Sequence, residues 1–176
     1  MVQASKEWQW LRCNERNRLL IDLGDELQLC TPFKLYQLTG DSLSNPKFCI
    51  DDAEYYQNVY FYLQNFKVWT DAQCCQVALN ATAAKFHLKP MLAKSWFFTE
   101  YTGNADRTEA IVALNSSQQT GEFFIVECDA ESSLCISLNS EFKLDEHLTL
   151  EPFQAIRVLN NRIHPLMLAD KITKTA

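Results

Sequence analysis

Hydrophobic and polar positions over residues 8–30 alternate in short runs separated by turns, as in an antiparallel meander. Apolar runs at residues 8–13 and 18–23 are separated by the polar segment 14–17, which is typical of a hairpin. A second turn, which contains a glycine, leads into a third run at residues 27–30. The pattern therefore predicts three short antiparallel strands near the start of the chain.

Two helices are predicted in the next part of the chain. The first runs from Asp51 to about Phe66, and apolar and aromatic side chains occupy most of its circumference. A helix of this kind is either deeply buried or covered by a partner, and the pattern leaves both interpretations open. The second helix begins at the capping-box sequence Thr70-Asp-Ala-Gln73 and ends before Pro90. Strands and helices together predict an N-terminal α/β domain.

After Lys94 the chain changes to short apolar runs separated by polar turns, which indicate an antiparallel sheet. One more helix is predicted over residues 152–163, where a proline suits the first turn and the apolar positions share one face. The change predicts two domains, residues 1–94 and 95–176. The predicted fold class is α+β, with two small domains, the second an antiparallel sheet with one helix. Its predicted strands cover residues 95–101, 109–115, 121–128 and 133–138.

Composition and charge narrow the class of protein. The chain has 176 residues, 47% of them hydrophobic and 22% charged, which is ordinary globular usage and supports a real core. Aromatic residues make up 12%, so some aromatic surface is expected at an interface. The net charge is −6, and the acidic excess lies in the C-terminal half. Nucleic acid is therefore not an expected partner, because phosphate binding needs a concentrated basic face.

The seven cysteines indicate the compartment. They form an odd set with no C-x-x-C pair, so we interpret them as buried small hydrophobic residues rather than as zinc ligands or disulfides. The N-terminus lacks a basic region followed by an apolar one, and no apolar run approaches the roughly 20 residues of a membrane span. The sequence therefore predicts a cytoplasmic protein without a membrane span.

Motifs for catalysis or cofactor binding are absent from the sequence. The four glycines are isolated, so they do not form a phosphate-binding loop, and the three histidines are too scattered for a zinc-binding pair. Asp51 and Asp52 are explained as helix-capping carboxylates more readily than as an acid–base pair. The adjacent Cys74 and Cys75 are expected in the core. No catalytic residue, metal or cofactor is predicted, although a cysteine that meets His87 in space stays an alternative.

The segment from Leu88 to Phe98 combines cations with apolar and aromatic residues. Lys89 and Lys94 are suited to acidic groups of a partner, and Trp96 offers a large apolar face. Such a segment either forms a binding groove or is a solvated linker with the tryptophan buried in the core. The residues alone leave both interpretations open.

Several ordered motifs resemble the ZapC family of bacterial cell-division proteins. The likeness is specific over residues 8–98 and continues with fewer identities into Ala155-Ile-x-x-x-Asn160-x-Arg162. No single motif carries a universal chemical signature, so the resemblance rests on their order and spacing. The motifs are Trp8-x-Trp10, Arg18-Leu-Leu-Ile-Asp-Leu23, Phe48-Cys-Ile-Asp-Asp-Ala53, Leu79-Asn80, and Leu88-Lys-Pro followed by Lys94-Ser-Trp-x-Phe98.

The resemblance implies a non-enzymatic cytoplasmic protein of the mid-cell division ring. Such a protein binds the polymerising GTPase FtsZ, promotes bundling of its protofilaments and lowers its GTPase activity. It also implies an N-terminal α/β domain followed by a β-barrel-like domain. FtsZ-binding positions of the family match Ile21, Lys89 and Lys94, and the chemistry of the motif adds Pro90, Ser95 and Trp96.

Joining filaments requires either two binding surfaces per chain or one surface plus self-association, since a monovalent monomer cannot bridge. A monomer is expected, and self-association stays open. Two rival interpretations are a small cytoplasmic enzyme with a cysteine or carboxylate in a cleft, and a structural module that self-associates through the aromatic helix at 51–66. Neither accounts for the ordered motifs.

Overall fold

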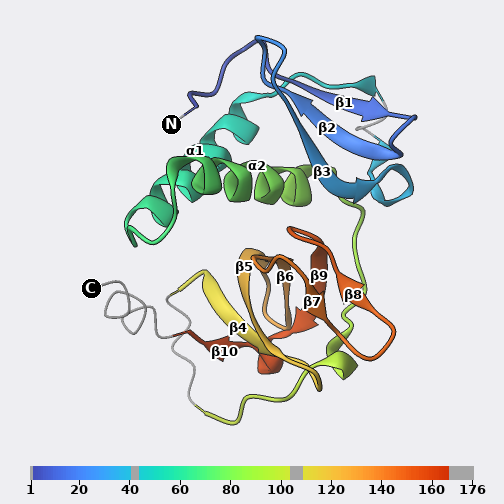
Figure 1. Ribbon diagram of the computed structural model, residues 1–176, viewed down its shortest axis with the longest axis vertical. Coiled ribbons are helices and arrows are strands. Elements are labelled where there is room, and N and C mark those ends of the chain that lie inside the picture. The colour runs from blue at the N-terminus through green and yellow to red at the C-terminus, as the bar shows by residue number, and fades with distance from the viewer. Residues whose placement is uncertain (1, 41–43, 104–108, 167–176) are drawn as a thin grey trace. The chain divides into compact units, whose positions relative to one another are not determined.

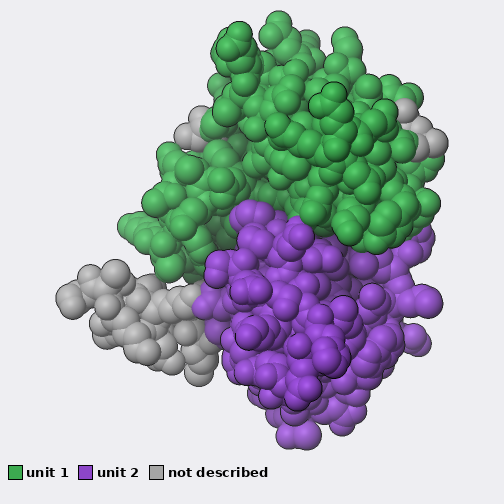
Figure 2. Space-filling model, turned by 45° about the vertical axis from the view of Figure 1, so that its right-hand side comes forward, with its two compact units in different colours: residues 1–89 green, residues 90–176 purple. Residues whose placement is uncertain are grey.

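The structure is a computed structural model that describes residues 2–40, 44–103 and 109–166. The chain divides into two compact units, Met1–Lys89 and Pro90–Ala176, which Figure 2 shows in different colours. This division falls within the basic and aromatic segment 88–98. The domain boundary that the sequence predicts after Lys94 stays a prediction.

A three-stranded antiparallel sheet opens the first unit, as predicted. Its strands are β1 (Gln9–Cys13), β2 (Arg18–Asp22) and β3 (Gln28–Lys34), and β2 is the central one (Figure 1). β2 is paired on both sides, and its apolar side chains Leu19, Leu20 and Ile21 are deeply buried. A short 3-10 helix, η1 (Leu35–Gln37), follows the sheet.

The two predicted helices are confirmed as α1 (Ile50–Gln64) and α2 (Asp71–His87), which pack against each other (Figure 1). At the start of α2, the Thr70 hydroxyl accepts the backbone N–H of Gln73, and the Gln73 side chain accepts the N–H of Thr70, so the capping box forms as expected. Cys74 and Cys75 are buried in the core, as predicted. The interpretation of all seven cysteines as buried residues is wrong, because Cys30, Cys49 and Cys128 are exposed.

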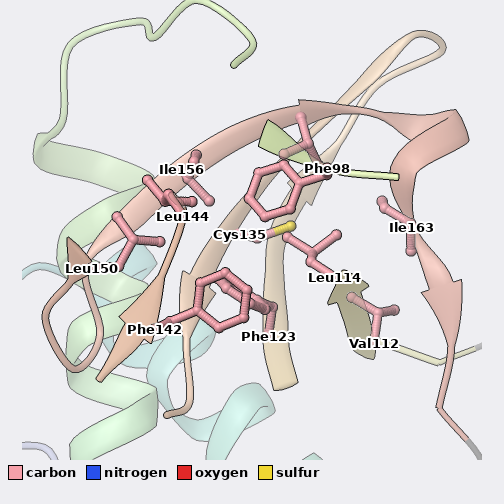
Figure 3. Close-up of a cluster of buried hydrophobic side chains, with 11 residues drawn as sticks. Phe98, Val112, Leu114, Phe123, Cys135, Phe142, Leu144, Leu150, Ile156 and Ile163 are labelled. Atoms are coloured by element: carbon pink, nitrogen blue, oxygen red, sulfur yellow. The ribbon is translucent and has the colours of Figure 1, made fainter. Parts of the chain in front are cut away.

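The second unit is built on a five-stranded antiparallel sheet in the order β10-β4-β5-β6-β9, with a separate hairpin of β7 and β8. Figure 3 shows its core cluster, in which Phe123 and Phe142 meet edge to face with ring centroids 5.0 Å apart. Gly121 leaves room for this packing, because a Cβ there would lie 2.4 Å from the Phe142 ring. The strands are β4 (Ile111–Asn115), β5 (Thr120–Cys128), β6 (Ser132–Ser137), β7 (Phe142–Lys143), β8 (Thr149–Leu150), β9 (Ala155–Leu159) and β10 (His164–Pro165).

Two predicted elements of the second unit are wrong. The helix expected over residues 152–163 is instead strand β9 followed by the 3-10 helix η4 (Asn160–Arg162). The strand expected over residues 95–101 is instead the 3-10 helix η3 (Ser95–Phe97) with an isolated bridge at Phe98. At residues 155–159 tertiary pairing overrides the local helical pattern, because β9 pairs along its length with β6.

The predicted α+β class is confirmed, with helices and strands in the first unit and an antiparallel sheet in the second. The one α-helix predicted for the second unit is not found among its described residues, where only short 3-10 helices occur. Within the described part of the chain, no helix has both the length and the apolar character that crossing a membrane requires.

Candidate functional site

Residues at the end of α2 lie alongside the segment that contains η1. The backbone N–H of Thr39 donates to the carbonyl of His87 at 2.8 Å, and Leu38 and Leu88 form an isolated bridge. The His87 ring is buried against the Trp10 indole, with ring centroids 4.6 Å apart, and this burial lowers the pKa of His87. His87 is therefore neutral at physiological pH.

Lys89 is the first predicted binding residue after this bridge, and its side chain is held in place. Its backbone N–H donates to the carbonyl of Gln37 at 2.8 Å, and its Nζ donates to the carbonyl of Tyr36 at 2.9 Å. Tyr36 itself is 68% exposed. The ammonium group thus lies at the surface beside an exposed aromatic residue.

Ile21, in contrast, has no exposed surface. It lies in the central strand β2, opposite Trp10 of β1 and Leu29 of β3, and its side chain is 0% exposed. Direct contact with a partner is therefore impossible in this conformation. Any influence of Ile21 on binding has to act through the packing of the sheet.

In the second unit, Lys94 and Ser95 cover the outer edge of β9. The backbone N–H of Lys94 donates to the carbonyl of Arg157 at 2.8 Å, and the hydroxyl of Ser95 accepts the N–H of Leu159 at 2.8 Å. β9 is the last strand of its sheet, so these bonds pair backbone groups that the sheet leaves open. They also fix the start of η3, while the Lys94 side chain stays exposed.

The tight turn of η3 separates two aromatic side chains. Phe98 enters the core and stacks on Phe142 with centroids 6.2 Å apart, whereas Trp96 is 71% exposed and contacts the neighbouring ring of Phe97. Leu92, which precedes η3, is 88% exposed. The alternative in which Trp96 is buried in the core is therefore wrong.

Two arginines form hydrogen bonds with the backbone of Lys94 and Ser95. Arg162 donates from Nε to the carbonyl of Ser95 at 3.2 Å and pairs with Glu100. Arg157, whose carbonyl binds Lys94, pairs with Glu127 and Asp129. These guanidinium groups are engaged by carboxylates, whereas the Lys94 side chain is exposed to solvent.

The six predicted binding residues fall in both units. Ile21 and Lys89 belong to the first, and Pro90, Lys94, Ser95 and Trp96 belong to the second. Ser95 is buried and acts as an anchor, while the others, apart from Ile21, are exposed. We call the exposed set the basic–aromatic segment, made of Lys89, Pro90, Leu92, Lys94 and Trp96.

Sequence reasoning missed several residues of this surface. Leu92 lies inside the motif, and its place between two lysines was a usable signal. Tyr36 is brought to Lys89 only by folding, since the two are 53 residues apart in the chain. Arg157 and Arg162 lay in a predicted helix, so their roles beside η3 were not visible.

The groups considered for catalysis have structural environments. Asp52 is buried and accepts hydrogen bonds from the Trp10 indole at 3.2 Å and from the Cys49 backbone at 2.9 Å, which confirms its capping role. Burial raises the pKa of the Cys74 thiol and raises that of Cys135 to about 12, so both stay protonated. Among the described residues, no group of three or more His, Cys, Asp or Glu side chains is placed to hold a metal ion.

Comparisons with known proteins cover both units. The model described as "Cell-division protein ZapC, N-terminal" matches residues 1–89, and "Cell-division protein ZapC, C-terminal" matches residues 90–169. A cell division protein ZapC of Pseudoalteromonas translucida is 57% identical over 167 residues, which is 95% of each chain. Those of Shewanella oneidensis and Aeromonas hydrophila are 36% and 32% identical, over 94% and 96% of this chain and 94% and 95% of their own. These names indicate no catalytic activity.

Proposed function

Because the chain belongs to the ZapC family of cell-division proteins, we propose that it binds FtsZ at the mid-cell division ring. In this proposal it promotes bundling of FtsZ protofilaments in the cytoplasm and thereby lowers FtsZ GTPase activity. It acts by binding alone and catalyses no reaction itself.

The observation that carries the proposal is the exposure of the basic–aromatic segment. Trp96 at 71% and Leu92 at 88% exposure flank the cation Lys94. Tryptophan is enriched among the residues that dominate binding energy, and a large apolar face left in water is stabilised when a partner covers it. The neighbouring ammonium groups favour an acidic partner surface and raise the rate of encounter.

The segment is also preorganised, which reduces the cost of binding. Backbone bonds from Lys94 and to Ser95 fix it on the edge of β9, and Lys89 is fixed to the carbonyl of Tyr36. Side chains that are already ordered lose less conformational entropy on association. Ile21 contributes indirectly, by keeping β2 packed.

Bundling requires that each chain, or each self-associated pair of chains, contacts two filaments. A chain that contacts two filaments stabilises the assembled state, because it binds that state in preference to the free subunits. Subunit exchange then slows, and hydrolysis that depends on exchange falls with it. The second contact is supplied either by another surface of the same monomer or by self-association.

The test is co-sedimentation of the purified protein with FtsZ and GTP, with GTP hydrolysis measured in the same tubes. We expect more FtsZ in the pellet and slower hydrolysis. The double variant Lys89→Glu plus Lys94→Glu reverses both charges of the segment, and Trp96→Ala removes its apolar face. Each is expected to weaken pelleting by at least about tenfold in the concentration required.

The matched control is Lys6→Glu plus Lys143→Glu, which makes the same charge change with one exposed lysine in each unit. This control should pellet FtsZ as the unchanged protein does. If the unchanged protein affects neither pelleting nor hydrolysis, FtsZ is not its partner. If the segment variants keep full activity as the control does, FtsZ binds elsewhere on the chain.

A further inference from the structure

One face of α1, together with Phe86 of α2, carries an open hollow that contains none of the residues of the basic–aromatic segment. Four of its lining residues, Asp51, Glu54, Tyr55 and Asn58, are spaced so that they share a single helix face, and Phe86 of α2 completes it. The hollow measures about 300 Å³ and opens to solvent. This volume is sufficient for one long side chain.

The hollow combines an aromatic floor with an acidic rim. The rings of Tyr55 and Phe86 meet edge to face with centroids 5.9 Å apart, and both are half-buried. Asp51 and Glu54 are exposed beside them. The positive end of α1 accounts for Asp51, in the first turn, but Glu54 lies beyond that turn. Helix capping alone therefore does not explain the pair of carboxylates.

The same two rings already hold a cation from within the chain. The Nζ of Lys85 lies 5.2 Å from the centroid of Tyr55 and 5.8 Å from that of Phe86. Aromatic faces attract cations through the ring quadrupole, and Lys85 lies within the distance at which this attraction acts. One ammonium does not neutralise two carboxylates, and the hollow keeps a net negative charge.

We propose that this acidic–aromatic hollow binds a lysine or arginine side chain presented by an exposed segment of a partner protein. The carboxylates attract the cationic head, and the rings contact the head and its apolar stem. Arginine is favoured, because its planar head stacks on rings and donates to two carboxylates at once. The preference for basic segments is opposite to that of the basic–aromatic segment, so the two surfaces recognise different partner chemistry.

The first test uses the full chain and no FtsZ, so its outcome is independent of the proposed function. A short neutral-flanked peptide with two arginines is titrated into isotope-labelled protein and followed by NMR. The matched peptide carries citrulline, which has nearly the shape of arginine but no charge. We expect shifts at the backbone amides of residues 51–58 and 85–87 with the arginine peptide, and none with the citrulline peptide.

Variants assign the binding to the hollow. Asp51→Asn plus Glu54→Gln should weaken peptide binding about fivefold or more, since it removes both charges. Lys85→Gln should strengthen it, because the competing internal cation is lost while the rings remain. A general loss of folding would weaken peptide binding and cannot strengthen it. An increase in affinity for the Lys85→Gln variant therefore distinguishes binding at the hollow from an effect on folding. The control Glu141→Gln plus Glu146→Gln makes an equal charge change at exposed positions of the second unit and should leave binding unchanged.

Three results would overturn the proposal. They are equal shifts with the citrulline peptide, equal weakening in the control variant, and unchanged or weaker binding after Lys85→Gln. Co-sedimentation with FtsZ then asks a separate question. If the arginine peptide binds the hollow but FtsZ does not pellet, the hollow stands and the FtsZ proposal fails.

Discussion

At the scale of single residues, exposure separates the roles of the predicted binding positions. Ile21 is 0% exposed in the central strand of its sheet, whereas Trp96 is 71% exposed at the surface. A substitution at either position is expected to reduce partner binding, but for different reasons. At Ile21 the loss follows from lower stability, and at Trp96 it follows from lost contact area.

Ile21→Ala is expected to lower the free energy of unfolding by about 2–5 kcal/mol, through lost apolar burial and a cavity. Urea denaturation followed by circular dichroism measures this change. The control Ile50→Ala removes the same atoms at a position that is 84% exposed, and should change stability by less than about 0.5 kcal/mol. Equal effects of the two substitutions would contradict the buried position of Ile21.

His87 predicts a pH dependence of stability. Burial lowers its pKa in the folded protein below the ordinary value of 6.5, so the unfolded chain takes up a proton at a higher pH than the folded one. Because the unfolded state then binds more protons, the free energy of unfolding falls as the pH drops below about 6.5 and towards the lower folded pKa. The loss should be small near neutral pH and grow through the mildly acidic range.

His87→Phe tests this origin, since it keeps a ring beside Trp10 and removes the titrating group. Urea denaturation from neutral pH to about pH 5 should give a flatter dependence for the variant than for the unchanged protein. Every other residue is the same in the two proteins, so a difference between their pH dependences reports on position 87. An unaltered pH dependence would assign the effect to other groups.

At the scale of elements, the edge of β9 and the 3-10 helix η3 act as one structural unit. The Ser95 hydroxyl accepts the Leu159 N–H, and the Ser95 carbonyl accepts Arg162 Nε. One buried serine therefore connects the basic–aromatic segment to the sheet. Without it, Trp96 and Lys94 would sample more conformations, and binding would cost more entropy.

Ser95→Ala is expected to lower the free energy of unfolding by about 1–2 kcal/mol, because the Leu159 N–H loses its acceptor. Hydrogen exchange of the Leu159 amide should become faster, and FtsZ pelleting should weaken. Ser140→Ala, at an exposed position, is the control and should change neither. Unchanged exchange at Leu159 in the Ser95 variant would show that this bond does not hold the edge.

The local sequence pattern around β9 is compatible with both a helix and a strand. Residues 152–163 carry apolar side chains at helical spacing, but Ile156 and Val158 also alternate in the strand pattern. Short apolar runs are ambiguous between the two, and pairing with β6 decides for the strand. In α2, by contrast, a capping box and apolar residues at helical spacing over 17 residues favour a helix alone, and that prediction is confirmed.

At the scale of the whole molecule, the second unit has a hydrophobic cluster built from its own described residues. Its buried cluster runs from Phe98 to Ile163, and aromatic contacts among Phe98, Phe123 and Phe142 lie within it (Figure 3). The first unit has a separate aromatic cluster around Trp8, Trp10 and Tyr56. We therefore expect each unit to unfold independently of the other.

Phe142→Ala should destabilise the second unit by about 3–5 kcal/mol and leave the first largely intact. Native-state hydrogen exchange resolves the two, with faster exchange expected over residues 109–166 and unchanged protection in α1 and α2. An equal loss of protection in both units would instead indicate one cooperative structure.

The sequence by itself determined the family, the α+β class, the meander, both helices and the chemistry of the basic–aromatic segment. These depend on local signals, such as caps, turns and apolar periodicity, and on the order of motifs, all of which are present in the unfolded chain. Only the tertiary structure decided that Ile21 is buried, that Trp96 is exposed, that residues 155–159 form a strand, and that Tyr36 lies beside Lys89. The physical reason is that burial and pairing depend on residues distant in sequence, and no local pattern encodes which of them meet.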